Sequence, residues 1–314
     1  MESKMKKTMP ETMSLYEFLQ MFPDEESATG FFEQRRWNGE PYCPHCGSIG
    51  NVSAVVGGKP MPFRCRDCRK HFSVRTGTVL AESKLPLHKW LLAIFMLHTA
   101  RKGVSSVQMA KEIGVTQKTA WFLNHRIRES MKHRGGMFGG EVEVDEAYIG
   151  GKAENMHSYK RAQRIQGRGA SGKQAVFGMR QREGQMVRAF PIDGTERMHL
   201  QSAIVENVKR GATIYSDAHR SYIGLPGYPH FSVSHSVGEY VRDQAHTNGI
   251  ESFWALLKRG YVGIYHQMSV QHLHRYVNEF SHRQNTIHAD MLDAMIATID
   301  GMAGRRLSYK ELIA

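Results

Sequence analysis

The chain has 314 residues, 41% of them hydrophobic, and is therefore long enough to bury a sizeable core in two or three domains. No apolar run approaches the ~18 residues of a transmembrane helix, and the N-terminal stretch lacks the apolar core of a signal peptide, which excludes a membrane-spanning protein and predicts a cytoplasmic one. The net charge of +12 favours a polyanionic partner such as nucleic acid.

The positive charge is concentrated in one part of the chain. Residues 81–140 contain 10 Lys and Arg against 3 Asp and Glu, although they make up less than a fifth of the sequence. Charge alone argues only for solubility and non-specific binding. The motifs inside and around this segment must therefore decide what is bound.

Four cysteines stand close together, after an N-terminal segment over residues 1–40 that we expect to be helical. Cys43 and Cys46 form one C-x2-C pair, Cys65 and Cys68 form the second, and 18 residues separate the pairs. This spacing is that of a tetrahedral structural Zn2+ site with four thiolate ligands. Two disulfides are the alternative, which the reducing cytoplasm disfavours. The sequence predicts a zinc ribbon over residues 41–80.

Basic and aromatic side chains surround the second cysteine pair, and we expect them on the outer face of the ribbon. They are either a solvated surface or a module that contacts DNA phosphates. The candidate DNA-binding residues are Arg66, Arg69 and Lys70, with Phe63 and Phe72 interleaved.

The segment over residues 81–134 has the pattern of a helical DNA-binding domain. After a first helix over residues 87–98, a short helix ends at Gly114 and a second helix follows a turn, as in a helix-turn-helix. The alternative is an ordinary helical bundle with a solvated polar face. If the second helix reads DNA, its outward positions are Gln117, Lys118, Asn124, Arg126 and Arg128.

Beyond a glycine-rich linker at residues 134–140, the chain becomes rich in β-strand patterns. Residues 141–149 alternate with period two, so Glu141, Glu143 and Asp145 share one face. Two more strands around a turn at Glu183 and Gly184 complete an antiparallel meander. A helix over residues 199–209 then precedes a fourth strand that ends at Asp217.

Three acidic residues form a candidate site for divalent cations. Asp145 and Asp217 lie on strands, and Glu251 opens an amphipathic helix, so distant parts of the chain could bring carboxylates together around hard cations. Lys258 lies two helical turns after Glu251 and could grip a phosphate. Glu251 alone would be interpreted as a solvated helix residue; the two aspartates favour the site.

The sequence resembles the DDE-type transposases of bacterial insertion sequences, specifically the fifteen-ninety-five group, over nearly its whole length. The resemblance rests on the cysteine pairs and on VDEAYIGGK, YSDAHRSY and HTNGIESFWALLKR, which contain Asp145, Asp217 and Glu251. It implies a multidomain α+β protein in which an RNase H-like α/β/α catalytic domain, residues 141–314, follows the zinc ribbon and the helix-turn-helix. Some members use Asn as the third catalytic residue, so Asn248 is the alternative to Glu251.

The resemblance also implies chemistry and partners. Two Mg2+ or Mn2+ ions would assist DNA strand cleavage and transfer at terminal inverted repeats and at target DNA, with Lys258 near the substrate. Joining two ends implies a homo-oligomer on DNA. Two alternatives stay open: a zinc-containing DNA-binding regulator with an inactive RNase H-like domain, and a nuclease or resolvase that does not transpose.

Overall fold

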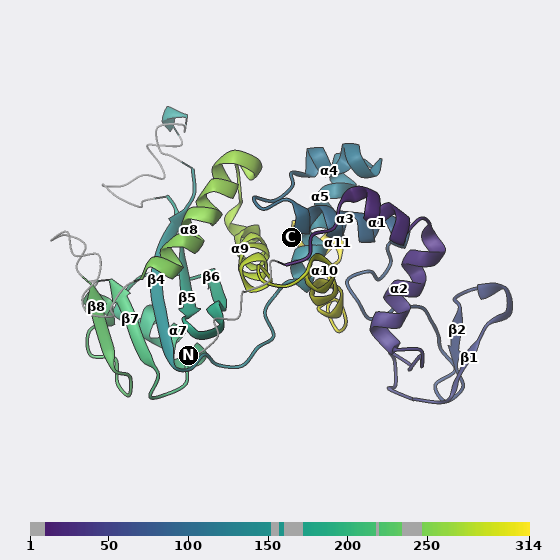
Figure 1. Ribbon diagram of the computed structural model, residues 1–314, viewed down its shortest axis with the longest axis horizontal. Helices are drawn as coiled ribbons and strands as arrows, with labels where there is room; N and C mark the ends of the chain where they lie inside the picture. The colour runs from purple at the N-terminus through teal and green to yellow at the C-terminus, as the bar shows by residue number, and fades with distance from the viewer. Residues whose placement is uncertain (1–9, 152–156, 160–171, 218–219, 234–246) are drawn as a thin grey trace, which may run out of the picture. The chain divides into compact units, whose positions relative to one another are not determined.

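A computed structural model describes residues 10–151, 157–159, 172–217, 220–233 and 247–314 (Figure 1). The chain divides into two compact units: unit 1 contains Met1–Lys132 and Thr286–Ala314, and unit 2 contains His133–Asn285. Within the described ranges, no helix combines the length and the apolar character that crossing a membrane requires.

Unit 1 begins with two helices whose starts are fixed by side chains. At the start of α1 (Leu15–Met21), Ser14 and Glu17 each accept a hydrogen bond from the other's backbone N–H. Asp24 and Ser27 repeat this arrangement at the start of α2 (Glu25–Trp37). Such reciprocal caps satisfy N–H groups that a helix leaves without intrahelical partners. Both helices lie in the segment that the sequence predicts to be helical.

The cysteine-containing segment forms a small antiparallel sheet in the order β1–β2–β3, with β1 at Val52–Ala54, β2 at Phe63–Cys65 and β3 at His71–Phe72. Phe63 and Phe72 pair across the sheet, and Trp37 at the end of α2 meets both rings edge-on at centroid distances of 5.2 and 5.9 Å. The expectation that these two rings lie on the outer face is wrong, because α2 covers them.

Three helices follow the ribbon: α3 (Leu87–Thr99), α4 (Ser106–Ile113) and α5 (Gln117–Ser130). Gly114 ends α4 with a left-handed φ of 63°, which glycine adopts without steric cost. Thr116 then accepts a hydrogen bond from the Thr119 N–H and starts α5. The two helices and the turn thus lie where the sequence predicts them.

The C-terminal part of the chain returns to unit 1. Helix α10 (Met291–Asp300) packs on α2, α3 and α5, and the ring of Tyr309 in α11 (Tyr309–Ile313) lies 5.5 Å from that of Phe122. Met295 and Ile299 belong to the same core as α3 and α5. The prediction that residues 141–314 form one domain is therefore wrong beyond residue 285.

This return changes the surroundings of α5. Asn124, Arg126 and Arg128 are only 1%, 5% and 1% exposed, so the expectation that they point outward is wrong. The physical reason is that α3, α4 and α10 all pack on α5, whereas Tyr309 of α11 contacts Phe122 in the first half of the helix. Gln117 and Lys118, in its first turn, are exposed as predicted.

Arg126 shows how a charged side chain is accommodated there. Its guanidinium lies 5.1 Å from the ring centroids of both Trp90 and Phe122, and it donates a hydrogen bond to the Ala81 carbonyl. Burial lowers its pKa to about 10. These contacts assign Arg126 to packing within unit 1.

Unit 2 is built on a mixed five-stranded sheet in the order β6–β5–β4–β7–β8. The strands are β4 (Glu141–Ile149), β5 (Gln174–Gln181), β6 (Val187–Pro191), β7 (Thr213–Asp217) and β8 (His230–Val233). The first three form the predicted antiparallel meander, with a short helical turn at Glu183–Gln185, whereas β7 and β8 add in parallel.

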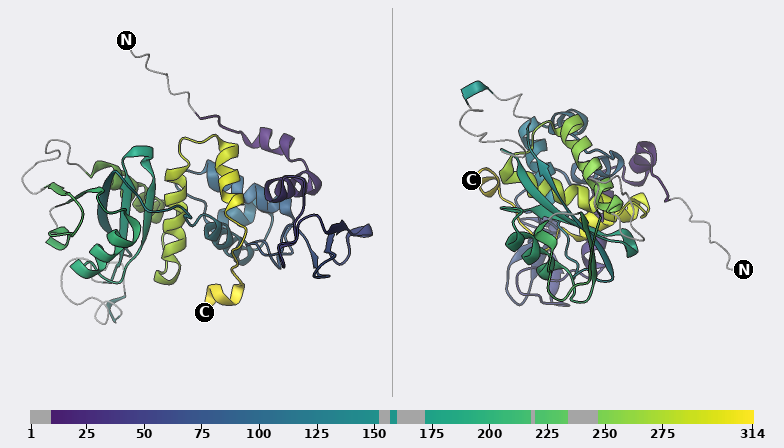
Figure 2. Two further views of the ribbon diagram at one scale, coloured as in Figure 1. Left: turned by 90° about the horizontal axis from the view of Figure 1, so that it is seen from below. Right: turned by 90° about the vertical axis from the view of Figure 1, so that its left-hand side faces the viewer.

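Helices cover both faces of this sheet. Val142 and Val144 of β4 share one core with Leu200 and Ile204 of α7 (Arg197–Asn207). Ala147 and Ile149 face the opposite core, which contains the apolar residues of α8 (Asn248–Gly260) and α9 (Val270–Asn285). A π-helical turn, Tyr261–Tyr265, follows α8, and α9 packs along β6 (Figure 2). The period-two pattern of β4 thus places Asp145 on the α8 side.

Candidate active site

Asp145 and Asp217 lie at equivalent positions on neighbouring parallel strands. Glu143 of β4 is the register partner of Tyr215 of β7, and each aspartate lies two residues further along its strand. Side chains two residues apart on a strand point to the same face, and register partners in parallel strands share a face. The sheet therefore brings these two aspartates together on the face that carries α8.

Asp145 is held by two hydrogen bonds. Its Oδ1 accepts from the Glu146 backbone N–H at 2.9 Å, and its Oδ2 accepts from the Trp254 indole N–H at 3.0 Å. The indole can come this close because Gly178, the partner of Asp145 on β5, has no side chain. A Cβ there would lie 2.5 Å from the Trp254 ring. The sheet and α8 thus meet at Asp145.

The acidity of Asp145 is strongly perturbed. Burial, together with the negative charges of Glu146, Asp217 and Glu251, raises its pKa to about 7. A carboxyl group loses its proton less readily when it is desolvated and surrounded by like charge. Asp217 and Glu251 are thus both among the charges that act on Asp145.

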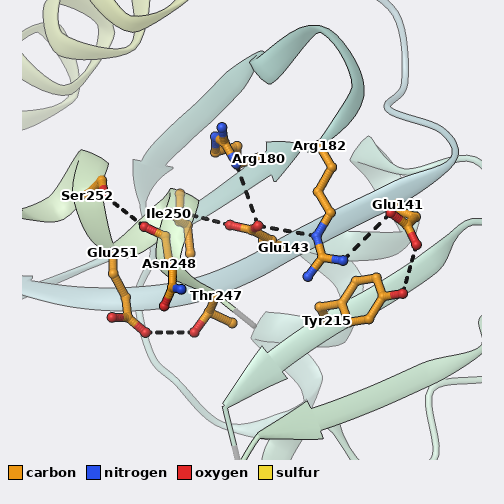
Figure 3. A network of polar contacts seen from close by, with 10 residues as sticks. All are labelled: Glu141, Glu143, Arg180, Arg182, Tyr215, Thr247, Asn248, Ile250, Glu251 and Ser252. Atoms are coloured by element: carbon orange, nitrogen blue, oxygen red, sulfur yellow. Dashed lines mark hydrogen bonds and ion pairs between the residues drawn. The ribbon is translucent and has the colours of Figure 1, made fainter. Parts of the chain in front are cut away.

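Glu251 lies in the first turn of α8, exposed, and its Oε1 accepts a hydrogen bond from Thr247 Oγ1 at 2.7 Å (Figure 3). Asn248 is also exposed one turn earlier, and its backbone carbonyl accepts from Ser252 Oγ at 2.8 Å. Lys258 lies on the same continuous helix, exposed, seven residues after Glu251. Residues seven apart on a helix are within about 20° of one another around its axis.

The carboxylates are less tightly grouped than the cysteines. Among the residues that the structure describes, the four cysteines are the one set of three or more metal-binding side chains whose ligand atoms all lie within 4.8 Å of one another. The sheet and α8 supply three separate carboxylates, whereas the cysteines form one compact set of ligands.

The cysteine cluster has the geometry that a structural zinc requires. Cys43 Sγ lies 3.6 Å from Cys68 Sγ, and Cys46 Sγ lies 3.7 Å from Cys65 Sγ. The backbone N–H of Cys68 is the main cause that lowers the pKa of Cys65 to about 7, which favours the thiolate that metals bind. The four thiols fit a structural zinc, and the neighbouring Arg66, Arg69 and Lys70 are exposed.

Three residues at this site are absent from the sequence-based candidates. Trp254 has a recognisable signal, since a buried indole N–H needs a hydrogen-bond partner. Glu143 shares a face with Asp145 in the period-two pattern, which does not distinguish an anchoring carboxylate from a solvated one. Thr247 precedes the helix that carries Glu251, where a hydroxyl commonly caps the helix instead.

Two family models match the parts of the chain just described. Residues 137–285 match the ISXO2-like transposase domain, and residues 23–71 match the transposase zinc-ribbon domain of the same IS1595 group. The chain belongs to the ISXO2-like family of IS1595 transposases. The resemblance given above is thus confirmed, and unit 2 of this ISXO2-like protein contains a DDE transposase domain, a type of polynucleotidyl transferase that acts on DNA.

Other proteins are similar over part or most of the chain. A protein described as an uncharacterized protein in transposable element ISH50 of Halobacterium salinarum is 29% identical over 253 residues, which cover 77% of this ISXO2-like chain and 84% of the relative. That relative is archaeal, so a bacterial origin stays a prediction.

A chain in the structure of the simian T-cell lymphotropic virus intasome in complex with PP2A regulatory subunit B56 gamma aligns with a TM-score of 0.28 and 12% identity. The alignment covers 59% of this ISXO2-like chain and 66% of that chain. A TM-score this low does not establish a shared fold.

Proposed function

We propose that this chain binds the terminal inverted repeats of an insertion sequence and catalyses DNA strand cleavage and strand transfer, with Asp145, Asp217 and Glu251 as its catalytic carboxylates. One observation carries the proposal: inside a transposase domain, Asp145 and Asp217 occupy equivalent positions on neighbouring parallel strands. They lie on the face of the sheet that packs against α8, whose first turn carries Glu251. The mixed five-stranded sheet with helices on both faces supports an RNase H-like fold for this domain.

The donor set fits hard divalent cations. Carboxylate oxygens are the ligands that Mg2+ and Mn2+ prefer. Burial is the main cause of the raised pKa of Asp145, and the neighbouring negative charges, which cations would offset, add to it. Asp145, Asp217 and Glu251 would hold the ions. When bound, such ions make a water or a 3′-hydroxyl a better nucleophile and stabilise the leaving oxygen of a phosphodiester.

Glu251 is favoured over Asn248 as the third ligand. Its negative charge is one of the causes that raise the pKa of Asp145, and a carboxylate binds Mg2+ better than an amide does. Thr247 orients the Glu251 carboxylate by donating a hydrogen bond to its Oε1. Lys258, on the same side of α8, would bind a substrate phosphate.

DNA contacts are assigned to two exposed basic surfaces of unit 1. Arg66, Arg69 and Lys70 surround the second cysteine pair, whose fold a structural zinc would stabilise. Gln117 and Lys118 stand in the first turn of α5, which is the part of a recognition helix that contacts base edges in a helix-turn-helix. Asn124, Arg126 and Arg128 are left out of this surface because they are buried.

The experiment that tests the function uses pure protein, Mg2+ or Mn2+, and duplexes containing the DNA that flanks its coding sequence. We expect end-specific strand cleavage and joined products, both dependent on the added cation and absent from Asp145→Asn. Cleavage without joining would indicate a nuclease, and end binding without cleavage would indicate a regulator. Pairing of two labelled ends in one complex would support a homo-oligomer on DNA.

A further inference from the structure

The start of α8 is held from outside the helix. Thr247 occupies the N-cap position, but its side chain makes no hydrogen bond to the helix backbone and binds Glu251 instead. The backbone N–H of Ile250, the third residue of the helix, donates to Glu143 Oε2 of β4 at 2.9 Å. A carboxylate from the sheet thus takes the place that a capping side chain usually fills.

Glu143 is completely buried, and it lies beside Arg180 of β5 and Arg182, the residue after β5. Arg180 Nη1 lies 3.5 Å and Arg182 Nε lies 3.2 Å from Glu143 Oε1 (Figure 3). The positive end of the α8 dipole meets the other oxygen. A charge buried this fully needs such partners, because an unpaired buried carboxylate is strongly destabilising.

The backbone of α8 lies unusually close to the side chains of Glu143 and Arg180. A Cβ built on Gly249 would lie 1.9 Å from Arg180 Nη1 and 2.6 Å from Glu143 Oε2. Only glycine at this position therefore allows the helix start to reach the carboxylate. The close approach is an observation independent of the hydrogen bond to Ile250, and it points to the same docking arrangement.

The arginines extend this arrangement to the strand that carries Asp217. Arg182 lies 3.6 Å from Glu141, and its guanidinium carbon is 3.7 Å from the centroid of the Tyr215 ring on β7. Tyr215 Oη in turn donates to Glu141 at 2.8 Å. Glu143 therefore occupies the centre of a network that reaches every element carrying a candidate catalytic carboxylate.

We propose that Glu143 is a positioning residue that anchors the first turn of α8, through the Ile250 N–H, so that Glu251 is placed beside Asp145 and Asp217. The inference rests on the proposed function of those three carboxylates. Glu143 itself is completely buried and acts through its hydrogen bond to α8.

The test compares two changes at Glu143 in the full-length protein. Glu143→Asp keeps the charge but shortens the side chain by one methylene, which draws the carboxylate back from the Ile250 N–H and from both arginines. Glu143→Gln keeps the reach and removes the charge. The matched control is Glu141→Gln, which alters the same network at Arg182 and Tyr215, away from α8. Hydrogen exchange, Mn2+ binding by calorimetry and DNA cleavage are measured on each.

We expect Glu143→Asp to speed exchange of the amides at residues 248–252 by about tenfold or more while the amides of β4 and β5 keep their protection. Loss of an outer partner of a metal ligand typically costs about 10–100-fold in metal affinity or activity, so the Mn2+ affinity that Asp145→Asn abolishes should weaken by that factor. The control should leave both values unchanged.

Exchange that rises evenly throughout unit 2, with unchanged Mn2+ affinity in the folded protein, would show that Glu143 only stabilises the fold and would overturn the inference. If either Glu143 variant fails to fold, the other variant and Gly249→Ala, which disturbs the same contact from the helix side, supply the measurement. Wild-type protein that neither binds Mn2+ nor cleaves would refute the proposed function, whereas the exchange result would still report whether Glu143 anchors α8.

Discussion

At the scale of single residues, the three carboxylates differ in their surroundings. Asp145 is mostly buried and hydrogen-bonded to Trp254, whereas Glu251 is exposed and bound to Thr247. Desolvating a carboxylate such as Asp145 lowers the stability of the folded protein, and a functional role commonly explains why such a group is present. Replacing a carboxylate by its neutral amide can therefore distinguish the two roles. Loss of a cation ligand should lower activity, whereas loss of a carboxylate that stabilises the fold should lower stability.

Replacing the carboxylates by their amides should abolish catalysis. Asp145→Asn, Asp217→Asn and Glu251→Gln should each lower strand cleavage by at least about a thousandfold, because a neutral side chain cannot offset the charge of divalent ions. Binding of DNA ends, measured by gel shift, should be unchanged because unit 1 supplies it. Asn248→Ala should be much milder. The reverse ranking of Glu251→Gln and Asn248→Ala would identify Asn248 as the third catalytic residue.

The raised pKa of Asp145 predicts how stability depends on pH when no divalent cation is added. The folded protein keeps the Asp145 proton up to about pH 7, whereas the unfolded chain releases it near its ordinary value of 3.8. The stabilisation that the bound Asp145 proton gives the folded state is therefore fully present below pH 4, and it is lost as pH rises to about 7. Asn at this position carries no titratable proton.

We accordingly expect the unfolding temperature of Asp145→Asn to exceed that of the wild type by a margin that grows between pH 4 and 7 and is constant above. Differential scanning calorimetry at several pH values gives this comparison. Added Mg2+ should raise the unfolding temperature of the wild type at pH 8 and leave that of the variant unchanged. A margin independent of pH would show that Asp145 titrates normally.

At the scale of elements, α5 is where the sequence and the structure differ most. The spacing of its apolar residues and the glycine before it predict both the helix and the turn, because these signals are local. The same periodicity predicts that Asn124, Arg126 and Arg128 lie on the solvent-facing side of the helix. They are buried because other helices of unit 1 pack on α5, among them α10 from the far end of the chain.

Unit 2 shows the same division between local and distant information. The alternation in β4 predicts the face on which Asp145 lies, and the end of β7 predicts Asp217, because side-chain direction follows from position along a strand. The anchoring role of Glu143 depends on Arg180, Gly249 and Ile250, which meet it only after folding. No local pattern contains that information.

We expect DNA binding to depend on the basic side chains that are exposed and not on those that are buried. Lys70→Ala and Lys118→Ala should each weaken end binding and reduce the slope of log affinity against log salt by about one unit for a phosphate contact. Lys209→Ala, an exposed lysine of unit 2 outside both proposed surfaces, is the matched control and should leave the slope unchanged. Fluorescence anisotropy between about 50 and 200 mM salt covers the informative range. Equal slopes in all three variants would argue against these surfaces.

The ribbon should depend on its metal. Structural zinc contributes about 10–16 kcal/mol of apparent binding free energy in small finger peptides, so Cys65→Ser should unfold the sheet of β1, β2 and β3. We expect about one zinc per chain by elemental analysis of the wild type, less in the variant, and faster proteolysis around residues 41–80. Soluble, active wild-type protein without zinc would contradict this prediction. The anchoring of α8 in unit 2 should be unaffected.

At the scale of the whole molecule, the C-terminal residues complete unit 1. Met295 of α10 is fully buried in its core, so Met295→Ala should lower the free energy of unfolding of unit 1 by about 2–5 kcal/mol. Ile287→Ala, at an exposed position in the same returning segment, should change it little. Denaturant unfolding followed by hydrogen exchange separates the two units. Equal effects of the two substitutions would show that α10 does not stabilise unit 1.

Because unit 2 is inserted between two parts of unit 1, all of its residues are translated before α10 and α11. A chain that terminates after residue 285 would contain Asp145, Asp217 and Glu251 but would lack Met295 and Ile299, which belong to the same core as the apolar residues of α5. The core of unit 1 is thus completed only by the last residues that the ribosome adds.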